Sequence, residues 1–173
     1  MMINFKFLNI YNLNYKWLAL SNTTIGSLMA SLDRNIIIIA LPTIALDLGL
    51  PLITLVWLTI GYWVVTASAL LTFGRLADMF GRVKLYNIGF ALFTVGSTLC
   101  CIAQTGEQLI VFRVIQGIGA AFIFSNSAAI ISDTFAESER GKALGINQIS
   151  IVIGSVIGLV VGGVLTSYLG WRS

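Results

Sequence analysis

Five long apolar segments dominate this sequence and limit what it can fold into. Over its 173 residues, 57% are hydrophobic and 10% are charged, whereas soluble domains carry about 25% charged residues. A soluble core of this length cannot bury so much apolar surface, so we expect an all-α membrane protein. A soluble helical bundle would need polar stripes, which the second to fifth segments lack. The five expected transmembrane helices cover residues 17–46, 52–73, 85–103, 109–131 and 143–169.

The distribution of lysine and arginine predicts how the chain is oriented. If successive spans alternate in direction, Arg172 alone lies opposite the N-terminus, on the side that also carries Asp47 and Glu107. Cations concentrate in cytoplasmic loops, so we expect a cytoplasmic N-terminal segment (residues 1–16), an external C-terminus and location in the plasma membrane. The cations on the N-terminal side are Lys6, Lys16, Arg75, Arg82, Lys84, Arg140 and Lys142.

Several classes of function find no support in the sequence. There is no histidine, which removes the commonest metal ligand and general base. Cys100 and Cys101 are adjacent and therefore point about 100° apart on a helix, so we expect packing thiols. The glycines of residues 117–120 lie inside a span and make no dinucleotide fingerprint. We therefore expect no enzyme, metal site or cofactor, and the scattered cations do not indicate a nucleic-acid partner.

Charged residues inside two spans are the strongest candidates for function. Asp33 and Arg34 interrupt the first segment, and Arg113 interrupts the fourth. Each costs about 2.5–3.5 kcal/mol at the bilayer centre, and Asp33 and Arg113 can offset this by pairing across a polar cavity. Burial favours a neutral carboxyl group and a nearby cation favours a charged one, so such an aspartate can bind and release a proton. The alternative is a static ion pair that links two helices.

Arg34 and several amides each allow two interpretations. Arg34 cannot face Asp33 on a helix, so it points to another helix or extends toward the membrane surface. The amides either line a cavity or form hydrogen bonds between helices, and we favour bonds between helices for most of them. These amides are Asn35, Gln116, Asn126, Asn147 and Gln148.

Two further patterns concern glycine. Residues 74–84, between the second and third segments, combine glycines with one aspartate and three cations, which predicts a tight polar loop in water. In the fifth segment Gly154, Gly158 and Gly162 recur every four residues and form a stripe on which another helix can pack closely. Gly145 and Gly163 lie in the same segment.

The motif residues together resemble the Major Facilitator Superfamily, most closely its fourteen-helix drug:proton antiporter branch (EmrB/QacA type). The fourth segment resembles the R-x-x-Q-G motif at residues 113–117, and the first resembles an L-D…A-L-P-x-I motif, with Asn35 and Ile38 replacing the usual threonine and asparagine. The loop matches G-x-x-x-D-x-x-G-R-x-[KR] at Gly74, Asp78, Gly81, Arg82 and Lys84. The fifth resembles the antiporter motif at Gly145, Gly154, Gly158, Gly162 and Gly163, with Leu159 in place of proline.

The resemblance implies a fold of two six-helix halves that rock about a central cavity. Five spans would form most of one half, so we expect an N-terminal fragment that does not transport alone and lacks the C-terminal half. We also expect the partner helix of the glycine stripe to be missing. The resemblance implies that Asp78 binds a helix N-terminus of the other half, so in this chain it should be solvated or satisfied locally.

The resemblance also implies a function. We expect proton-coupled export of small molecules, with Asp33 and Arg113 as the coupling pair and residues 74–84 as a cytoplasmic gate. The partners are then the lipid bilayer, a small-molecule substrate and protons. An uptake symporter or facilitator of the same fold is one alternative. A self-contained five-span scaffold or channel that forms oligomers is another.

Overall fold

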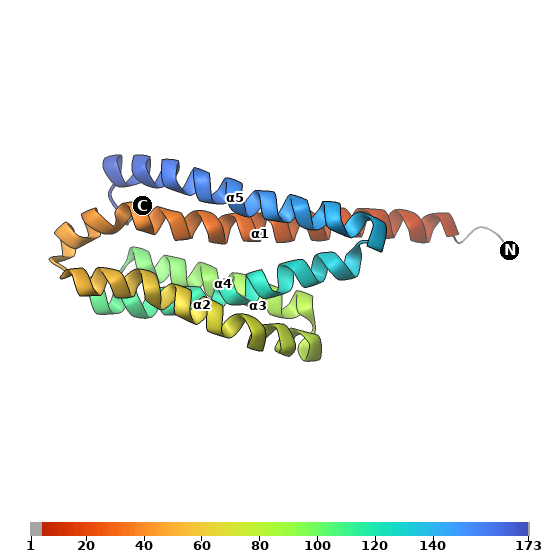
Figure 1. The fold of residues 1–173 in the computed structure, drawn as a ribbon, viewed down its shortest axis with the longest axis horizontal. Helices are drawn as coiled ribbons and strands as arrows, with labels where there is room; N and C mark the ends of the chain where they lie inside the picture. The colour runs from red at the N-terminus through yellow and green to blue at the C-terminus, as the bar shows by residue number, and fades with distance from the viewer. Residues whose placement is uncertain (1–4, 173) are drawn as a thin grey trace.

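Five long α-helices joined by short turns make up residues 5–172, which the computed structural model describes (Figure 1). Among these residues, all five helices are long and apolar enough to cross a membrane, which confirms the expected fold class. Of the expected N-terminal segment, residues 1–4 lie outside the described residues, and the remainder continues the first helix. The helices are α1 (Phe5–Leu48), α2 (Leu52–Phe80), α3 (Arg82–Cys101), α4 (Gly106–Thr134) and α5 (Glu137–Tyr168).

The polar loop expected at residues 74–84 is helical except at one position. Helix α2 continues to Phe80, α3 begins at Arg82, and only Gly81 lies between them, with a φ of 98° that favours glycine. The polar stretch 132–142 is likewise helical apart from residues 135–136. The expectation of longer loops was wrong because it placed the helix ends where the apolar side chains stop. A helix continues into water as long as its backbone hydrogen bonds do.

The opposite end of the bundle has turns of another kind. Gly49, at φ 61°, directly follows the last residue of α1, and Pro51 immediately precedes α2. The hydroxyl of Thr105 accepts a hydrogen bond from the backbone N–H of Gln108 at 3.3 Å and so caps α4. We call this the Asp47 end of the bundle, and the opposite end, where α2 meets α3, the Arg82 end.

Helix α4 is the centre of the bundle. Fourteen of its 29 residues are buried, against three of the 29 residues of α2, and it contacts all four other helices. Helices α1 and α5 pack along each other on one side, and α2 and α3 cover the other side of α4 (Figure 1). A polar side chain on the buried face of α4 therefore lies in the interior of the bundle.

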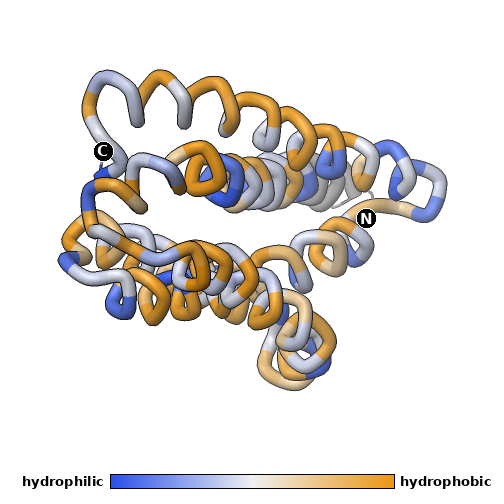
Figure 2. The backbone as a smooth tube through the Cα atoms, turned by 60° about the vertical axis from the view of Figure 1, so that its left-hand side comes forward, coloured by the Kyte–Doolittle hydropathy of each residue, from blue (hydrophilic) through white to orange (hydrophobic). Residues whose placement is uncertain are grey.

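The outside of the bundle is apolar. Figure 2 shows hydrophobic residues along every helix. Leu46 and Leu71 are more than 80% exposed, and exposed Val and Ile residues continue along α5. A soluble protein rarely exposes an apolar surface this continuous, whereas lipid chains cover it without cost. The structure thus agrees with a membrane protein and not with a soluble bundle.

Candidate functional site

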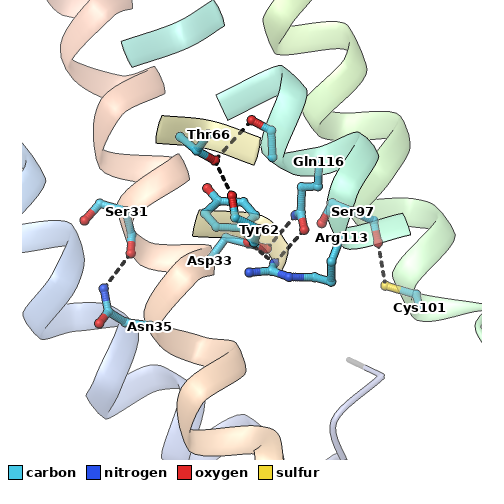
Figure 3. A network of polar contacts seen from close by, with 10 residues as sticks. Ser31, Asp33, Asn35, Tyr62, Thr66, Ser97, Cys101, Arg113 and Gln116 are labelled. Carbon is cyan, nitrogen blue, oxygen red and sulfur yellow. Dashed lines mark hydrogen bonds and ion pairs between the residues drawn. The ribbon is translucent and has the colours of Figure 1, made fainter. Parts of the chain in front are cut away.

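Asp33 of α1 and Arg113 of α4 meet inside the bundle (Figure 3). The Nη1 atom of Arg113 donates a hydrogen bond to Oδ2 of Asp33 at 2.8 Å. The arginine side chain is 3% exposed and the aspartate side chain 24%, so the cation is buried while part of the carboxylate remains accessible. Both residues are candidates from the sequence, and the structure brings them together.

Gln116 completes this contact. It lies one helical turn after Arg113, and its Nε2 donates to Oδ1 of Asp33 at 2.9 Å. Its Oε1 accepts a hydrogen bond from Arg113 at 2.6 Å. Both oxygens of the carboxylate therefore bind donors from α4. Gln116 is a site residue that sequence reasoning left among the helix-linking amides, although its spacing from Arg113 is the available signal.

Tyr62 of α2 supplies the other wall of the site. The Arg113 guanidinium lies 4.4 Å from the centroid of its ring, within the range of a cation–π interaction. Nε of Arg113 and the Tyr62 hydroxyl are buried without a hydrogen-bond partner among the described residues. The arginine is thus held by one charge, one amide and one ring, and it retains an unused donor.

A cavity of about 320 Å³ lies beside the pair. Asp33, Arg113 and Gln116 line it, together with apolar residues of α1, α3 and α4. Trp171, which follows α5, lines it too, and its Nε1 donates to Oδ2 of Asp47 at 2.9 Å. The accessible part of the Asp33 carboxylate can therefore meet water or a small ligand, with Trp171 among the residues that line the cavity.

The glycine stripe of α5 packs on α1, next to Asp33. A Cβ atom on Gly154 or Gly158 would lie 2.5 Å from a backbone oxygen of α1, that of Leu28 or Leu32, and one on Gly162 would lie 2.9 Å from Cα of Ile36. The expectation that the partner helix is missing was wrong, because α1 itself takes that place. Gly145 has no neighbour within 4 Å of such a Cβ, and the nearest atom to one on Gly163 is 3.9 Å away.

Two of the five amides bond to the backbone of their own helix, and one bonds to another helix, so the expectation of bonds between helices for most of them was wrong. Asn35 donates to the backbone oxygen of Ser31 at 2.8 Å, and Asn126 donates to that of Phe122 at the same distance. A free carbonyl one turn earlier on the helix is the nearest acceptor for such a short side chain. Gln116 bonds to another helix, through Asp33 of α1.

Arg82 binds residues of α2 and α4 at the end of the bundle opposite the cavity. It donates to Oδ1 of Asp78 at 2.8 and 2.9 Å, to Oδ2 of Asp133 at 2.7 Å and to the backbone oxygen of Ala129 at 3.2 Å. Asp78 is thus satisfied locally, as the sequence predicts. Gly74 lies within α2 with open space around it, and Lys84 is exposed, so neither contributes a contact here.

These observations define a multi-pass membrane protein with a charged, cavity-facing site in its interior. The sequence profile of the Major Facilitator Superfamily matches residues 23–173, and the chain belongs to that family. It is a family of transporters, in agreement with the expectation that the chain is not an enzyme.

The curated relatives include transporters with different names. The chain is 37% identical to riboflavin transporter RibZ of Clostridioides difficile (strain 630), covering 91% of this chain and 35% of the relative. It is 37% identical to multidrug resistance protein 3 of Bacillus subtilis (strain 168), covering 86% and 29%. It is 35% identical to puromycin resistance protein pur8 of Streptomyces alboniger, covering 91% and 31%. The chain thus spans about a third of the length of these relatives.

A solved structure has the same fold. It is the crystal structure of a bacterial homologue of the human lysosomal transporter Spinster, in an inward-facing and unoccupied conformation. The TM-score is 0.77 at 24% sequence identity, and the match covers 87% of this chain and 32% of that one. The five helices therefore match part of a Major Facilitator fold.

Proposed function

We propose that this chain belongs to a proton-coupled exporter of small molecules and that Asp33 is the residue that carries the proton. The observation behind the proposal is the arrangement of Asp33. Its carboxylate is held by a buried arginine and by Gln116, yet it is 24% exposed beside a cavity within membrane-length helices. A carboxylate used only to join two helices has no need of that access.

The geometry suggests how a proton can be coupled to movement. Protonation of Asp33 removes the negative charge that faces Arg113 and leaves the guanidinium with Gln116 and the Tyr62 ring. A buried cation without its counter-ion is costly, so the protonated state favours any rearrangement that hydrates Arg113. Proton binding and helix movement are then thermodynamically linked.

The relatives support a small-molecule substrate. Two of those described above carry names of drug or antibiotic resistance, which favours export. The name of the first, riboflavin transporter, supports a second candidate, an uptake symporter or facilitator on the same fold. Substrate accumulation in inverted and in right-side-out vesicles separates the two. Membership in a transporter family argues against the self-contained scaffold or channel.

The proposal includes an orientation. Arg75, Arg82 and Lys84 lie at the Arg82 end, as do Arg140 and Lys142 near the start of α5, while Arg172 lies at the Asp47 end. The positive-inside rule therefore puts the Arg82 end and the N-terminus in the cytoplasm and the Asp47 end outside, in the plasma membrane. In this orientation the contacts of Arg82 form a cytoplasmic latch between α2, α3 and α4, and residues 74–84 would act as the gate.

Proton antiport can be tested in inverted membrane vesicles. The protein is expressed at its full natural length, a pH gradient is imposed, and dequenching of acridine orange is followed after addition of a compound. Ethidium, puromycin, riboflavin and 2-naphthoate provide cationic, neutral and anionic trials. We expect dequenching with at least one compound in the natural protein and none in Asp33→Asn at equal membrane content. Unchanged dequenching in Asp33→Asn contradicts the proposal.

A further inference from the structure

Arg34 is a second arginine in the membrane interior, and the coupling mechanism does not use it. It follows Asp33 in α1 but points elsewhere. Its guanidinium lies over the Trp63 ring of α2, 4.5 Å from the centroid. Across the described residues, no acceptor hydrogen-bonded to this guanidinium and no carboxylate paired with it is found. A membrane-interior cation that relies on one ring alone needs an explanation.

The charges around Arg34 do not balance. The Asp33 carboxylate already binds Arg113 through one oxygen and Gln116 through the other. One carboxylate and two guanidinium groups therefore share this level of the bundle, which leaves one positive charge in excess. The other acidic residues lie at the ends of the helices, too far along the bundle to compensate: Asp47, Asp78, Glu107, Asp133, Glu137 and Glu139.

The surroundings of Arg34 are open. Its side chain is half-buried, and Trp63 beneath it is 45% exposed. Hydrocarbon chains do not cover a guanidinium at this depth, because arginine inside a membrane faces protein or a water-filled cavity. A lipid headgroup is excluded for the same reason of depth. The face of α1 and α2 that carries Arg34 and Trp63 is therefore expected to border protein or a water-filled cavity and not lipid chains.

The chemistry of the two side chains indicates what such a solute is. The Trp63 ring holds the guanidinium through a cation–π contact, and the guanidinium N–H groups have no acceptor among the described residues. These groups can bind a carboxylate or phosphate through two parallel hydrogen bonds. Ile38, one helical turn after Arg34, and Ile60, one turn before Trp63, are 39% and 46% exposed. Charged and apolar surfaces thus adjoin each other.

We propose that Arg34 and Trp63 form a substrate-selecting site for amphipathic organic monoanions, in which Arg34 binds the carboxylate or phosphate and the exposed apolar side chains contact the ring-containing body. The proposal rests on the transport function proposed above and narrows its substrate class. It assigns to Arg34 a role in specificity, separate from the role of Asp33 in carrying the proton.

The test is a binding comparison that does not require transport. The protein, at its full natural length, is reconstituted in nanodiscs of phosphatidylcholine, which has no net charge. It is titrated with 2-naphthoate and with 2-naphthamide, which differ in charge but share the aromatic body. Calorimetry gives both affinities. We expect naphthoate to bind about tenfold more tightly than naphthamide, the ratio that one charged hydrogen-bonded contact provides. Arg34→Gln should abolish this ratio, and Arg34→Lys should keep part of it because the charge remains.

Matched variants make the result specific. Arg75→Gln removes one cation from the exposed end of α2 and should leave the ratio unchanged. Asp33→Asn removes the negative charge nearest to Arg34 and should raise the affinity for naphthoate. Because this change also frees Arg113, the rise is assigned to Arg34 only if it is lost in the double variant Asp33→Asn, Arg34→Gln. Circular dichroism verifies that each variant retains its helices. If Arg34→Gln does not fold, the intermediate ratio expected for Arg34→Lys decides.

Three outcomes overturn the proposal: equal affinities of the natural chain for the two probes, binding of neither probe, or an undiminished ratio in both Arg34 variants. None of them bears on whether Asp33 carries a proton. Conversely, loss of the anion preference in Arg34→Gln supports the site even if Asp33→Asn leaves proton antiport intact. The two proposals can therefore fail separately.

Discussion

Gly158 of α5 lies directly against the backbone carbonyl of Leu32 of α1, the residue that precedes Asp33. A Cβ atom at position 158 would be 2.5 Å from that oxygen, a distance that real side chains do not tolerate. Nearby, the Ser31 hydroxyl donates to the backbone oxygen of Ile151 at 2.8 Å, which ties the same two helices together. The contact between α1 and α5 therefore holds the backbone next to Asp33 close against α5.

Substitution of Gly158 by alanine tests this contact. We expect the free energy of unfolding to fall by about 1–3 kcal/mol, because the added methyl group forces the two backbones apart. The measurement is helix loss followed by circular dichroism during titration from mild detergent into sodium dodecyl sulfate. Gly163→Ala is the matched control, since the nearest atom to its Cβ is 3.9 Å away. Helix propensity alone favours alanine over glycine at both positions, so a change at Gly158 equal to that at Gly163 would show that the close contact with α1 does not limit stability.

The ion pair of the site makes a prediction about coupled substitutions. Arg113→Met leaves the part-buried Asp33 carboxylate without its cation, and we expect a loss of about 3–5 kcal/mol in the free energy of unfolding. The double variant Asp33→Asn, Arg113→Met should recover much of that loss, because no charge remains unpaired. A double-mutant cycle at neutral pH measures the coupling. Additive effects would mean that the pair is not energetically linked.

Gln116 should contribute less than Arg113 to the free energy of unfolding, and it acts through the same carboxylate, that of Asp33. Gln116→Leu removes the hydrogen bond to Oδ1 of Asp33 at 2.9 Å and the acceptor for Arg113 at 2.6 Å. We expect a loss of about 1–3 kcal/mol in unfolding free energy, the usual cost when a buried partner is removed. Gln116→Glu provides an acceptor without the donor and should place a second negative charge beside Asp33. Its effect on the pH dependence of transport is the measurement that separates positioning from packing.

The Asp47 end makes a prediction about access to the cavity. Trp171 lines the cavity together with Cys100, and its indole is held by Asp47. In a Cys101→Ser background, Trp171→Ala should raise the labelling rate of Cys100 by a small maleimide several-fold, because bulk is removed from the cavity wall. Trp171→Phe retains the bulk and should raise it less. Equal labelling in all three proteins would show that Trp171 does not limit access.

The ion pairs at the Arg82 end should matter little for stability. Arg82 and its partners Asp78 and Asp133 are all partly or largely exposed, and exposed pairs contribute about 0–1 kcal/mol each. Arg82→Ala should therefore lower the unfolding free energy by no more than about 2 kcal/mol, with a smaller effect in 1 M salt because exposed charges are screened. Arg75→Ala serves as the control, since that side chain is exposed on α2. A larger, salt-independent loss would indicate that Arg82 acts through its contact with the Ala129 carbonyl.

The sequence by itself determined the number of helices, their apolar character and the two positions where charge enters the interior. These are local properties: a stretch is apolar or not, and Asp33 and Arg113 are ionisable, whatever lies beside them. The motif residues also indicated the family, since residues 23–173 match its profile. Helix ends were less predictable, because α2 continues past its apolar stretch to Phe80.

Only the tertiary structure decided which helices meet. It showed that α5 packs on α1, that Gln116 binds the same carboxylate as Arg113, and that Arg34 lies over Trp63. These contacts join residues from different helices, and they depend on how whole surfaces fit together. A glycine stripe or an extra arginine specifies that a close partner is needed, but the shape and charge of the neighbouring helices determine which partner that is.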